Sequence, residues 1–117
     1  RLTVASGDLS VQGDAVNVLV NPMARRIEVA PAAPNPFNPR TLIAFDLPSE
    51  MSVSILVYDA FGRLIDVLME GMVMPQGRNE VVWQGRDSNG RPCPSGIYFY
   101  RFVAGDVKIT KKMVLLR

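Results

Sequence analysis

Residues capable of covalent or acid–base chemistry are few in this chain and stand apart from one another. There is no histidine, which excludes the Ser–His and Cys–His pairs that activate a nucleophile. The single cysteine, Cys93, lies between Pro92 and Pro94 with no base near it in the sequence. We therefore interpret it as a small, half-buried apolar residue. The carboxylates are isolated on expected strand ends and turns, where exposure to solvent explains them better than an acid–base pair: Asp46, Glu50, Asp59, Asp66, Glu70 and Glu80. We predict that the chain is not an enzyme and carries no cofactor.

Two segments contain groups that bind ligands in other proteins. Asp87-Ser88-Asn89-Gly90 is similar to the start of a calcium loop, but such a loop needs further acidic ligands and a late Glu. Arg91, Pro92 and Cys93 follow instead, so we favour a β-turn that ends at Gly90 and keep calcium as the alternative. Trp83 and the tyrosines could stack on sugars in a carbohydrate-binding domain, but their phase in the expected strands places them in the core.

Length and composition fit one globular domain. The chain has 117 residues, of which 48% are hydrophobic and 21% charged. Thirteen Lys and Arg against eleven Asp and Glu leave a net charge of +2, too small to indicate a nucleic-acid partner. One cysteine cannot form a disulfide within the chain, and every apolar run is too short to span a membrane. Because the first residue is Arg1 and no signal peptide is visible, we expect a processed chain or a fragment of a longer one.

Short alternating segments separated by turn residues dominate the chain and show no sustained helical period. Asp59-Ala60-Phe61-Gly62 is expected to be a tight turn, with Gly62 at a positive φ, and residues 69–77 are expected to form a loop. Side chains that share a face are expected in five segments: Val16, Val18 and Val20; Thr41, Ile43, Phe45 and Leu47; Val53, Ile55 and Val57; Val81 and Trp83; and Tyr98, Tyr100 and Phe102. This spacing predicts an all-β fold, an Ig-like antiparallel β-sandwich of about seven strands.

A proline-rich segment divides the chain. Residues 31–39 include four prolines, which exclude a helix or a central strand. We expect a stiff connector of polyproline type, or the lip of a domain. Residues 1–30 cannot form a core alone, so they either complete a preceding β domain, which we favour, or add strands to the sandwich of residues 40–117.

Apolar residues also occupy positions expected to face outward. If the sets above point into the core, then Leu56, Val82, Ile97 and Phe99 point away from it, where an isolated antiparallel sandwich presents polar residues. We expect a patch that covers another domain, another protein or a second copy of the chain.

Three blocks of sequence carry a resemblance to a known family. They are Pro34-Asn35-Pro36-Phe37-Asn38-Pro39; Val57-Tyr58-Asp59-Ala60-Phe61-Gly62-Arg63-Leu64; and Gly96-Ile97-Tyr98-Phe99-Tyr100-Arg101, followed by residues 112–117. With Trp83, Gly85 and Gly90 between the second and third blocks, the chain from Pro34 to Arg117 resembles the C-terminal sorting and anchoring domains of proteins exported by the type IX secretion system of Bacteroidetes-related bacteria. It also resembles the related Ig-like domain of the flagellar hook-capping protein.

The resemblance implies a non-catalytic secretion and attachment module at the end of a larger secreted or cell-surface protein. Such a domain folds in the periplasm and is read by the outer-membrane secretion machinery, after which a surface sortase removes it and attaches the cargo to lipopolysaccharide. We expect recognition in the last two strands, with strand addition to the final strand as its physical basis, at Gly96, Tyr98, Lys111, Lys112, Met113, Val114, Leu115, Leu116 and Arg117.

Two alternatives stay open at this point. Lys111, Lys112 and Arg117 could be charges on an edge strand that prevent aggregation between sheets, and not a recognition signal. The domain could also be a structural subunit or linker of an extracellular assembly, such as a hook-cap-like scaffold or a filament, in which the outward apolar patch joins neighbouring copies.

Overall fold

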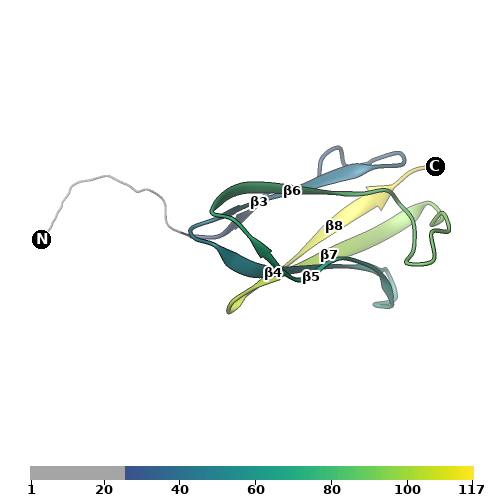
Figure 1. Ribbon diagram of the computed structural model, residues 1–117. Helices are drawn as coiled ribbons and strands as arrows, with labels where there is room; N and C mark the ends of the chain where they lie inside the picture. Colours follow the sequence, from purple (N-terminus) through teal and green to yellow (C-terminus); the bar gives the residue numbers. More distant parts are fainter. Residues whose placement is uncertain (1–25) are drawn as a thin grey trace, which may run out of the picture.

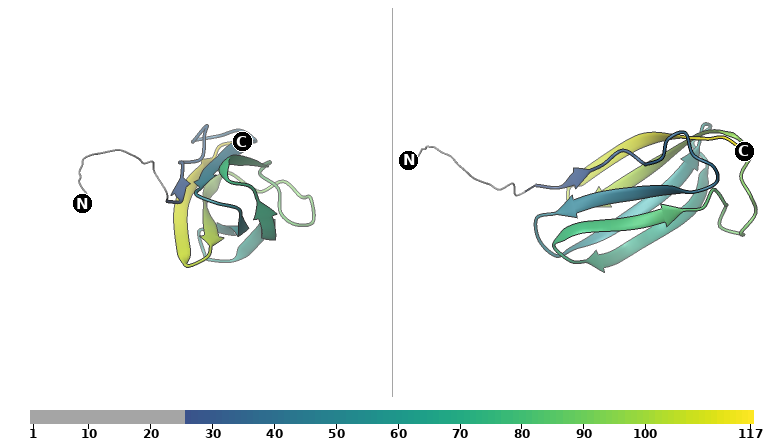
Figure 2. Two further views of the ribbon diagram at one scale, coloured as in Figure 1. Left: turned by 60° about the vertical axis from the view of Figure 1, so that its left-hand side comes forward. Right: turned by 90° about the horizontal axis from the view of Figure 1, so that it is seen from above.

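Seven strands and no helix make up residues 26–117, the part of the chain that the computed structural model describes. The strands are β2 (Glu28–Val29), β3 (Thr41–Leu47), β4 (Met51–Asp59), β5 (Leu64–Met74), β6 (Gly77–Trp83), β7 (Gly96–Ala104) and β8 (Val107–Leu115). They form two antiparallel sheets, in the orders β2-β3-β6 and β5-β4-β7-β8, which lie face to face as two layers (Figure 1, Figure 2). The predicted all-β sandwich is confirmed. The strand expected around Val16, Val18 and Val20 lies outside the described residues.

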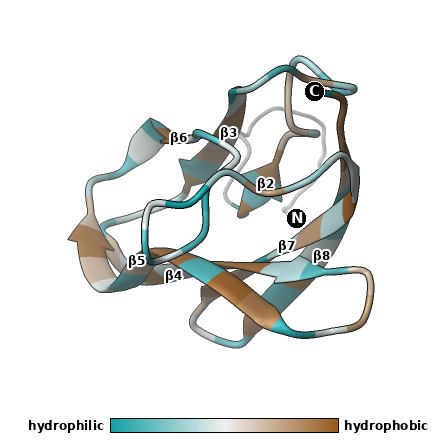
Figure 3. Cartoon of the chain, turned by 90° about the vertical axis from the view of Figure 1, so that its right-hand side faces the viewer, coloured by the Kyte–Doolittle hydropathy of each residue, from teal (hydrophilic) through white to brown (hydrophobic). Residues whose placement is uncertain are grey.

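The core lies between the two sheets and is built by the alternating side chains. Val53, Ile55 and Val57 of β4 are fully buried, as are Tyr100 and Phe102 of β7. Ile43 and Phe45 of β3 cover them from the other sheet, and the rings of Phe45 and Phe102 lie 5.1 Å apart. Each large apolar side chain removed from water in this way contributes about 1.5–3 kcal/mol. The inward faces expected for β3, β4 and β7 are therefore confirmed, and hydrophobic and hydrophilic residues alternate along the strands (Figure 3).

The loop expected at residues 69–77 was wrong. β5 continues through Met74, and only Pro75 and Gln76 separate it from β6. Gly71 adopts a positive φ of +59° inside the strand and its N–H donates to the Ser54 hydroxyl, 2.9 Å away. The pairing of β4 with β5 shifts register three times along its length. These bulges break the alternation of side chains, so the sequence of this strand reads as a loop.

The proline-rich segment contacts both sheets of the sandwich. Ala33 bridges Leu42 of β3, and Phe37 bridges Leu115 of β8 in parallel, so residues 31–39 cross from one sheet to the edge of the other. Ala32 and Phe37 are buried in the core. Proline suits such an edge because it has no N–H to leave unpaired.

Residues before the proline-rich segment also contact the sandwich. Glu28 and Val29 pair with Asp46 and Phe45 of β3, and the Tyr100 hydroxyl donates to the carbonyl of Ala30 at 2.7 Å. The division of the chain into residues 1–30, 31–39 and 40–117 stays a prediction.

The outward apolar residues fall on two faces, where a single patch was expected. Leu56 of β4 and Ile97 and Phe99 of β7 lie on the outside of the four-stranded sheet, whereas Val82 of β6 lies on the outside of the other. Ile97 and Val82 are each 44% exposed. A partner that covers the first three residues therefore does not touch Val82.

Candidate functional site

The three sequence blocks meet at one end of the sandwich, the end that carries Arg117. The turn at residues 59–63, the long loop at residues 84–95 and the proline-rich segment all lie there (Figure 1). Strand direction explains this, because β4 ends and β7 begins at the same rung, where Asp59 pairs with Tyr98. Gly96, at the start of β7, pairs with Leu115 at the end of β8.

An aromatic cluster of Phe37, Trp83 and Tyr98 forms the interior of this end. The Trp83 ring lies 5.6 Å from the Phe37 ring and 5.2 Å from the Tyr98 ring, both in tilted or edge-on geometry, which aromatic pairs favour. Their polar atoms have partners, since the Trp83 indole donates to the Arg86 carbonyl at 3.0 Å and the Tyr98 hydroxyl to the Pro94 carbonyl at 2.7 Å. The cluster thereby fixes both ends of the long loop to the core.

The second half of β8 is bordered by the proline-rich segment on its free edge. The Asn35 side chain accepts from the Val114 N–H at 2.9 Å and donates to the Lys112 carbonyl at 3.2 Å. The Phe37 N–H donates to the Val114 carbonyl, and its carbonyl accepts from the Leu116 N–H, each at 2.9 Å. Main-chain groups that an added strand would use are therefore already occupied from Lys112 to Leu116.

Arg117 is attached to the long loop. Its guanidinium donates to the carbonyls of Gly85, at 2.7 Å, and Cys93, while its N–H donates to the Ser95 hydroxyl at 2.8 Å. Gly85 has a φ of +69°, and a Cβ there would lie 2.7 Å from the Pro39 carbonyl oxygen. A side chain at residue 85 would thus push apart the loop, the proline-rich segment and Arg117.

Family membership follows from comparison with known proteins. Residues 32–116, well over half of the chain, match the family described as the secretion system C-terminal sorting domain. The chain belongs to this family. The matched range contains the whole sandwich from Ala32 and nearly all of the end just described, and membership implies a secreted or cell-surface protein.

Solved structures support the fold of the sorting domain. It is similar to part of dimeric latent PorU from Porphyromonas gingivalis, with a TM-score of 0.63 and 21% identity over 86% of this chain. It is also similar to part of PorZ, a surface component of the type IX secretion system of the same bacterium, with a TM-score of 0.51 and 21% identity over 78% of this chain. The chain covers only 10% of PorU and 11% of PorZ. No curated protein matches it.

The nine residues predicted for recognition in the sorting domain divide by exposure. Tyr98, Met113 and Leu115 are buried in the core, so in the folded domain no receptor reaches their side chains. Gly96, Lys111 and Val114 are half-buried, whereas Lys112, Leu116 and Arg117 are exposed. Sequence reasoning placed all nine on the last two strands but could not separate those that build the core from those on the surface.

Asp87 organises the long loop through its side chain. Its carboxylate accepts from the N–H groups of Asn89 and Arg91, each at 2.9 Å, and the Gly90 N–H donates to the Asp87 carbonyl at 2.9 Å. The β-turn ending at Gly90 is therefore confirmed. The backbone hydrogen bond from Arg91 is the main cause that lowers the pKa of Asp87 below its ordinary value. Within residues 26–117 no three His, Cys, Asp or Glu side chains gather closely enough to hold a metal ion.

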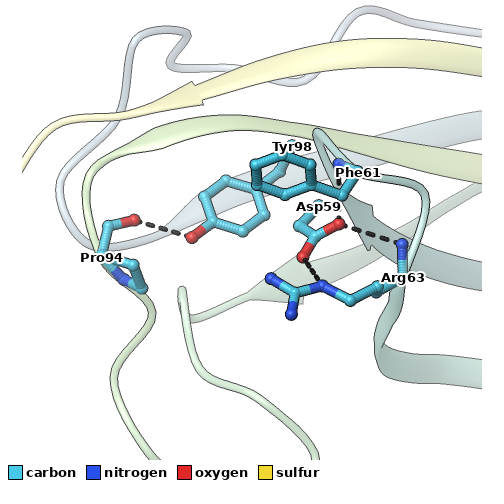
Figure 4. Close-up of polar contacts among 5 residues, drawn as sticks. All are labelled: Asp59, Phe61, Arg63, Pro94 and Tyr98. Atoms are coloured by element: carbon cyan, nitrogen blue, oxygen red, sulfur yellow. Dashed lines mark hydrogen bonds and ion pairs between the residues drawn. The ribbon is translucent and has the colours of Figure 1, made fainter.

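Asp59 organises the neighbouring turn and differs from the solvated residue expected there. It is only 8% exposed. Its carboxylate accepts from the N–H groups of Phe61 and Arg63, each at 2.9 Å, and from the Arg63 guanidinium at 2.7 Å (Figure 4). Burial opposes the charged form, but these hydrogen bonds outweigh it and lower the pKa of Asp59. The tight turn at Gly62, whose φ is +83°, is confirmed; Tyr58 precedes it on the outside of the sheet.

Cys93 lies inside this end of the domain. It is 5% exposed, and burial, aided by the nearby Asp87 carboxylate, raises the pKa of its thiol. A raised pKa keeps the thiol protonated and unreactive, in agreement with the interpretation of Cys93 as a small apolar residue. Burial likewise raises the pKa of Tyr100 to about 12.

The described residues contain no helix of the length and apolar character needed to cross a membrane.

Sequence reasoning missed the groups that tie the end together. Asn35 was noted as part of a motif, but its two bonds to β8 join residues 77 and 79 positions apart. Ser95 and the carbonyls of Gly85 and Cys93 carried no signal, because any residue provides a carbonyl and serine is common in loops.

Proposed function

We propose that this domain is a non-catalytic secretion and cell-surface attachment module of a larger exported protein. It folds in the periplasm and is presented, already folded, to the outer-membrane machinery of a type IX system. The match of residues 32–116 to the family of sorting domains is the observation that carries this proposal. The geometry supports the proposal, because the motif residues of the family pack and hydrogen-bond together at one end of the sandwich and do not form a reactive site.

The surface read by the machinery is the exposed part of the terminal block, residues 112–117. Lys112 and Leu116 project from this block, and Leu116 is 52% exposed. Recognition of a folded surface by side chains suits this block, since its backbone edge is occupied by Asn35 and Phe37. Strand addition, in contrast, needs unpaired main-chain groups, and these are left to the first half of β8.

Attachment to the cell surface is the final step of the proposed route. A surface sortase would cleave ahead of the sandwich and transfer the cargo to lipopolysaccharide. The family resemblance supports this step.

A secretion assay tests the proposal. The whole chain is fused to the C-terminus of a periplasm-exported fluorescent reporter in a bacterium with a type IX system, beside the reporter alone and a fusion that lacks residues 112–117. We expect only the complete fusion to reach the surface or the medium. Retention of the complete, folded fusion in the periplasm would contradict the proposal. Attachment is read separately, as a shift of the reporter to the large, heterogeneous mass of a lipopolysaccharide conjugate.

A further inference from the structure

No strand of residues 26–117 covers the outside of the four-stranded sheet, and this face has two unlike halves. We define the outer face by the outward positions of β4, β7 and β8 and by Leu64 and Val67 of β5, which lie across from Tyr58 and Leu56. Tyr58, Phe99 and Lys112 share one rung, and Leu56, Arg101 and Thr110 the next. Along these two rungs the face runs from aliphatic on the β5 side to cationic and polar on the β8 side, with the aromatic rings between.

The cations of the outer face lie on β7 and β8, whereas the exposed acidic residue of its strands, Glu70, lies on β5 at the opposite edge of the sheet. Arg101, Lys108 and Lys112 occupy outward positions of β7 and β8, and none of the outward positions of β4, β7 and β8 holds Asp or Glu. The ion pairs between described residues involve other cations, namely Arg63, Arg78 and Arg91. Among the described residues, this half of the face is therefore a source of positive potential.

A shallow groove lies where the two halves meet. Tyr58 and Phe99 line it together with Arg101 and Thr110, and the turn at residues 59–62 closes one end. A guanidinium beside aromatic rings favours a carboxylate carried on an apolar stem, because the rings bury the stem while the guanidinium binds both oxygens. Tyrosine, phenylalanine and arginine are also residues that protein interfaces concentrate.

The charge and the apolar area of the outer face favour one of three candidate partners: a second copy of the chain, a polysaccharide or another protein. A second copy docked face to face would place the cations either against the same cations, which is costly, or against the aliphatic half, which leaves them without counter-charges. A polysaccharide would stack on the two rings but would leave aliphatic side chains uncovered, of which Leu64 is 54%, Val67 38% and Ile97 44% exposed. A protein surface with apolar side chains among carboxylates covers both halves.

We propose that the outer face is a docking site for an acidic protein segment, with Arg101 as its anchor. This inference goes beyond the sorting role and does not depend on it, because Arg101, Lys108 and the apolar half of the face lie outside the terminal block. Lys112 belongs to both surfaces, and docking at Arg101 leaves Leu116 exposed for the secretion machinery.

Binding of defined probes to the whole chain, followed through its amide NMR signals, tests this site. The probe is a synthetic peptide in which aspartate alternates with leucine, and its control carries lysine in place of aspartate. We expect saturable shifts at Phe99, Arg101 and Thr110 with the acidic peptide only, weakened at about 1 M salt, where charges are screened within a few ångströms. Arg101→Glu and Lys108→Glu should each weaken binding by about tenfold. Arg40→Glu, an exposed reversal ahead of β3 in the other sheet, should leave it unchanged.

Three results would contradict the proposal that an acidic protein segment docks on the outer face. One is equal weakening by Arg40→Glu, which would indicate attraction to net charge alone. Another is binding of the anionic polysaccharide polygalacturonate at the groove without binding of the peptide. The third is a dimer in sedimentation that Leu64→Asp dissociates, since this would identify a second copy as the occupant. The secretion assay can succeed or fail independently of all three.

Discussion

The two halves of β8 belong to one strand but have different neighbours. From Val107 to Lys111 the strand pairs, among residues 26–117, with β7 alone, and its other edge is unpaired in that part of the chain. From Lys112 onward, Asn35 and Phe37 border the same edge, and Arg117 is bonded to the long loop. The first half is an ordinary edge strand, protected by exposed lysine as such edges commonly are.

Within the terminal block, residues 112–117, some side chains build the core and others lie on the surface. Met113 and Leu115 are fully buried and hold the block in the core, whereas Lys112 and Leu116 are exposed. Under the function proposed above, a receptor would read a surface whose shape depends on the folded state of the whole end of the domain. Secretion that requires this surface would by the same means exclude unfolded cargo domains.

The largest expected effect comes from truncating Leu115 to alanine, with the same truncation of its neighbour Leu116 as the comparison. Leu115→Ala empties a fully buried position and should lower the free energy of unfolding by about 2–5 kcal/mol. Leu116→Ala trims a side chain that is 52% exposed and should change it by less than about 0.5 kcal/mol. Urea denaturation followed by tryptophan fluorescence measures both. Equal losses would show that the block is not divided between core and surface.

Release of Arg117 from the long loop should come next in size. Arg117→Ala removes the hydrogen bonds to the carbonyls of Gly85 and Cys93 and should cost about 1–2 kcal/mol, since hydrogen bonds from a charged donor are among the stronger ones. Arg78→Ala is the matched control, because it breaks only an exposed ion pair with Glu80. Indistinguishable denaturation midpoints for the two variants would argue against the attachment.

Removal of the Asn35 side chain tests the border between the two halves directly. Asn35→Ala should cost about 1 kcal/mol and accelerate hydrogen exchange at the Val114 amide, which loses its acceptor. Exchange at Thr110, in the first half, should stay as it is. The control is Asn38→Ala, at an exposed position of the same segment. A uniform acceleration along β8 would mean that the halves open together.

The smallest effect is expected from acid. The pKa values of Asp59 and Asp87 are lowered in the folded domain, so their contribution is complete above the unfolded pKa of about 3.9. It is lost as the pH falls through the lower folded values. Asp87→Asn should flatten the dependence of Tm on pH in this acid range, because the long loop then no longer changes on protonation. Asp106→Asn, at the exposed tip of the β7–β8 hairpin, is the matched control for the loss of one carboxylate. A steeper dependence of Tm on pH in Asp87→Asn would contradict a lowered pKa of Asp87 in the folded domain.

The sequence was sufficient for the fold because the core strands alternate regularly. Thr41 to Leu47, Val53 to Val57 and Tyr98 to Phe102 each place one face in the core, as the period of two requires. It failed at β5, where bulges and Gly71 interrupt that period. It also failed at the terminal block, where the contacts of Asn35 and Arg117 depend on a chain crossing that joins distant residues. Alternation shows which side chains point inward but not which outside surface another segment covers.

The most direct test of the account changes only the exposed side chains of the terminal block in the secretion assay. Lys112→Glu with Leu116→Asp is compared with Lys108→Glu with Val73→Asp, which makes the same charge changes at exposed positions elsewhere on the four-stranded sheet. Both fusions should be folded, as shown by unchanged denaturation midpoints. We predict that the first remains in the periplasm while the second reaches the surface. Export of the first at the level of the unchanged domain would contradict the claim that the terminal block is read through its exposed residues.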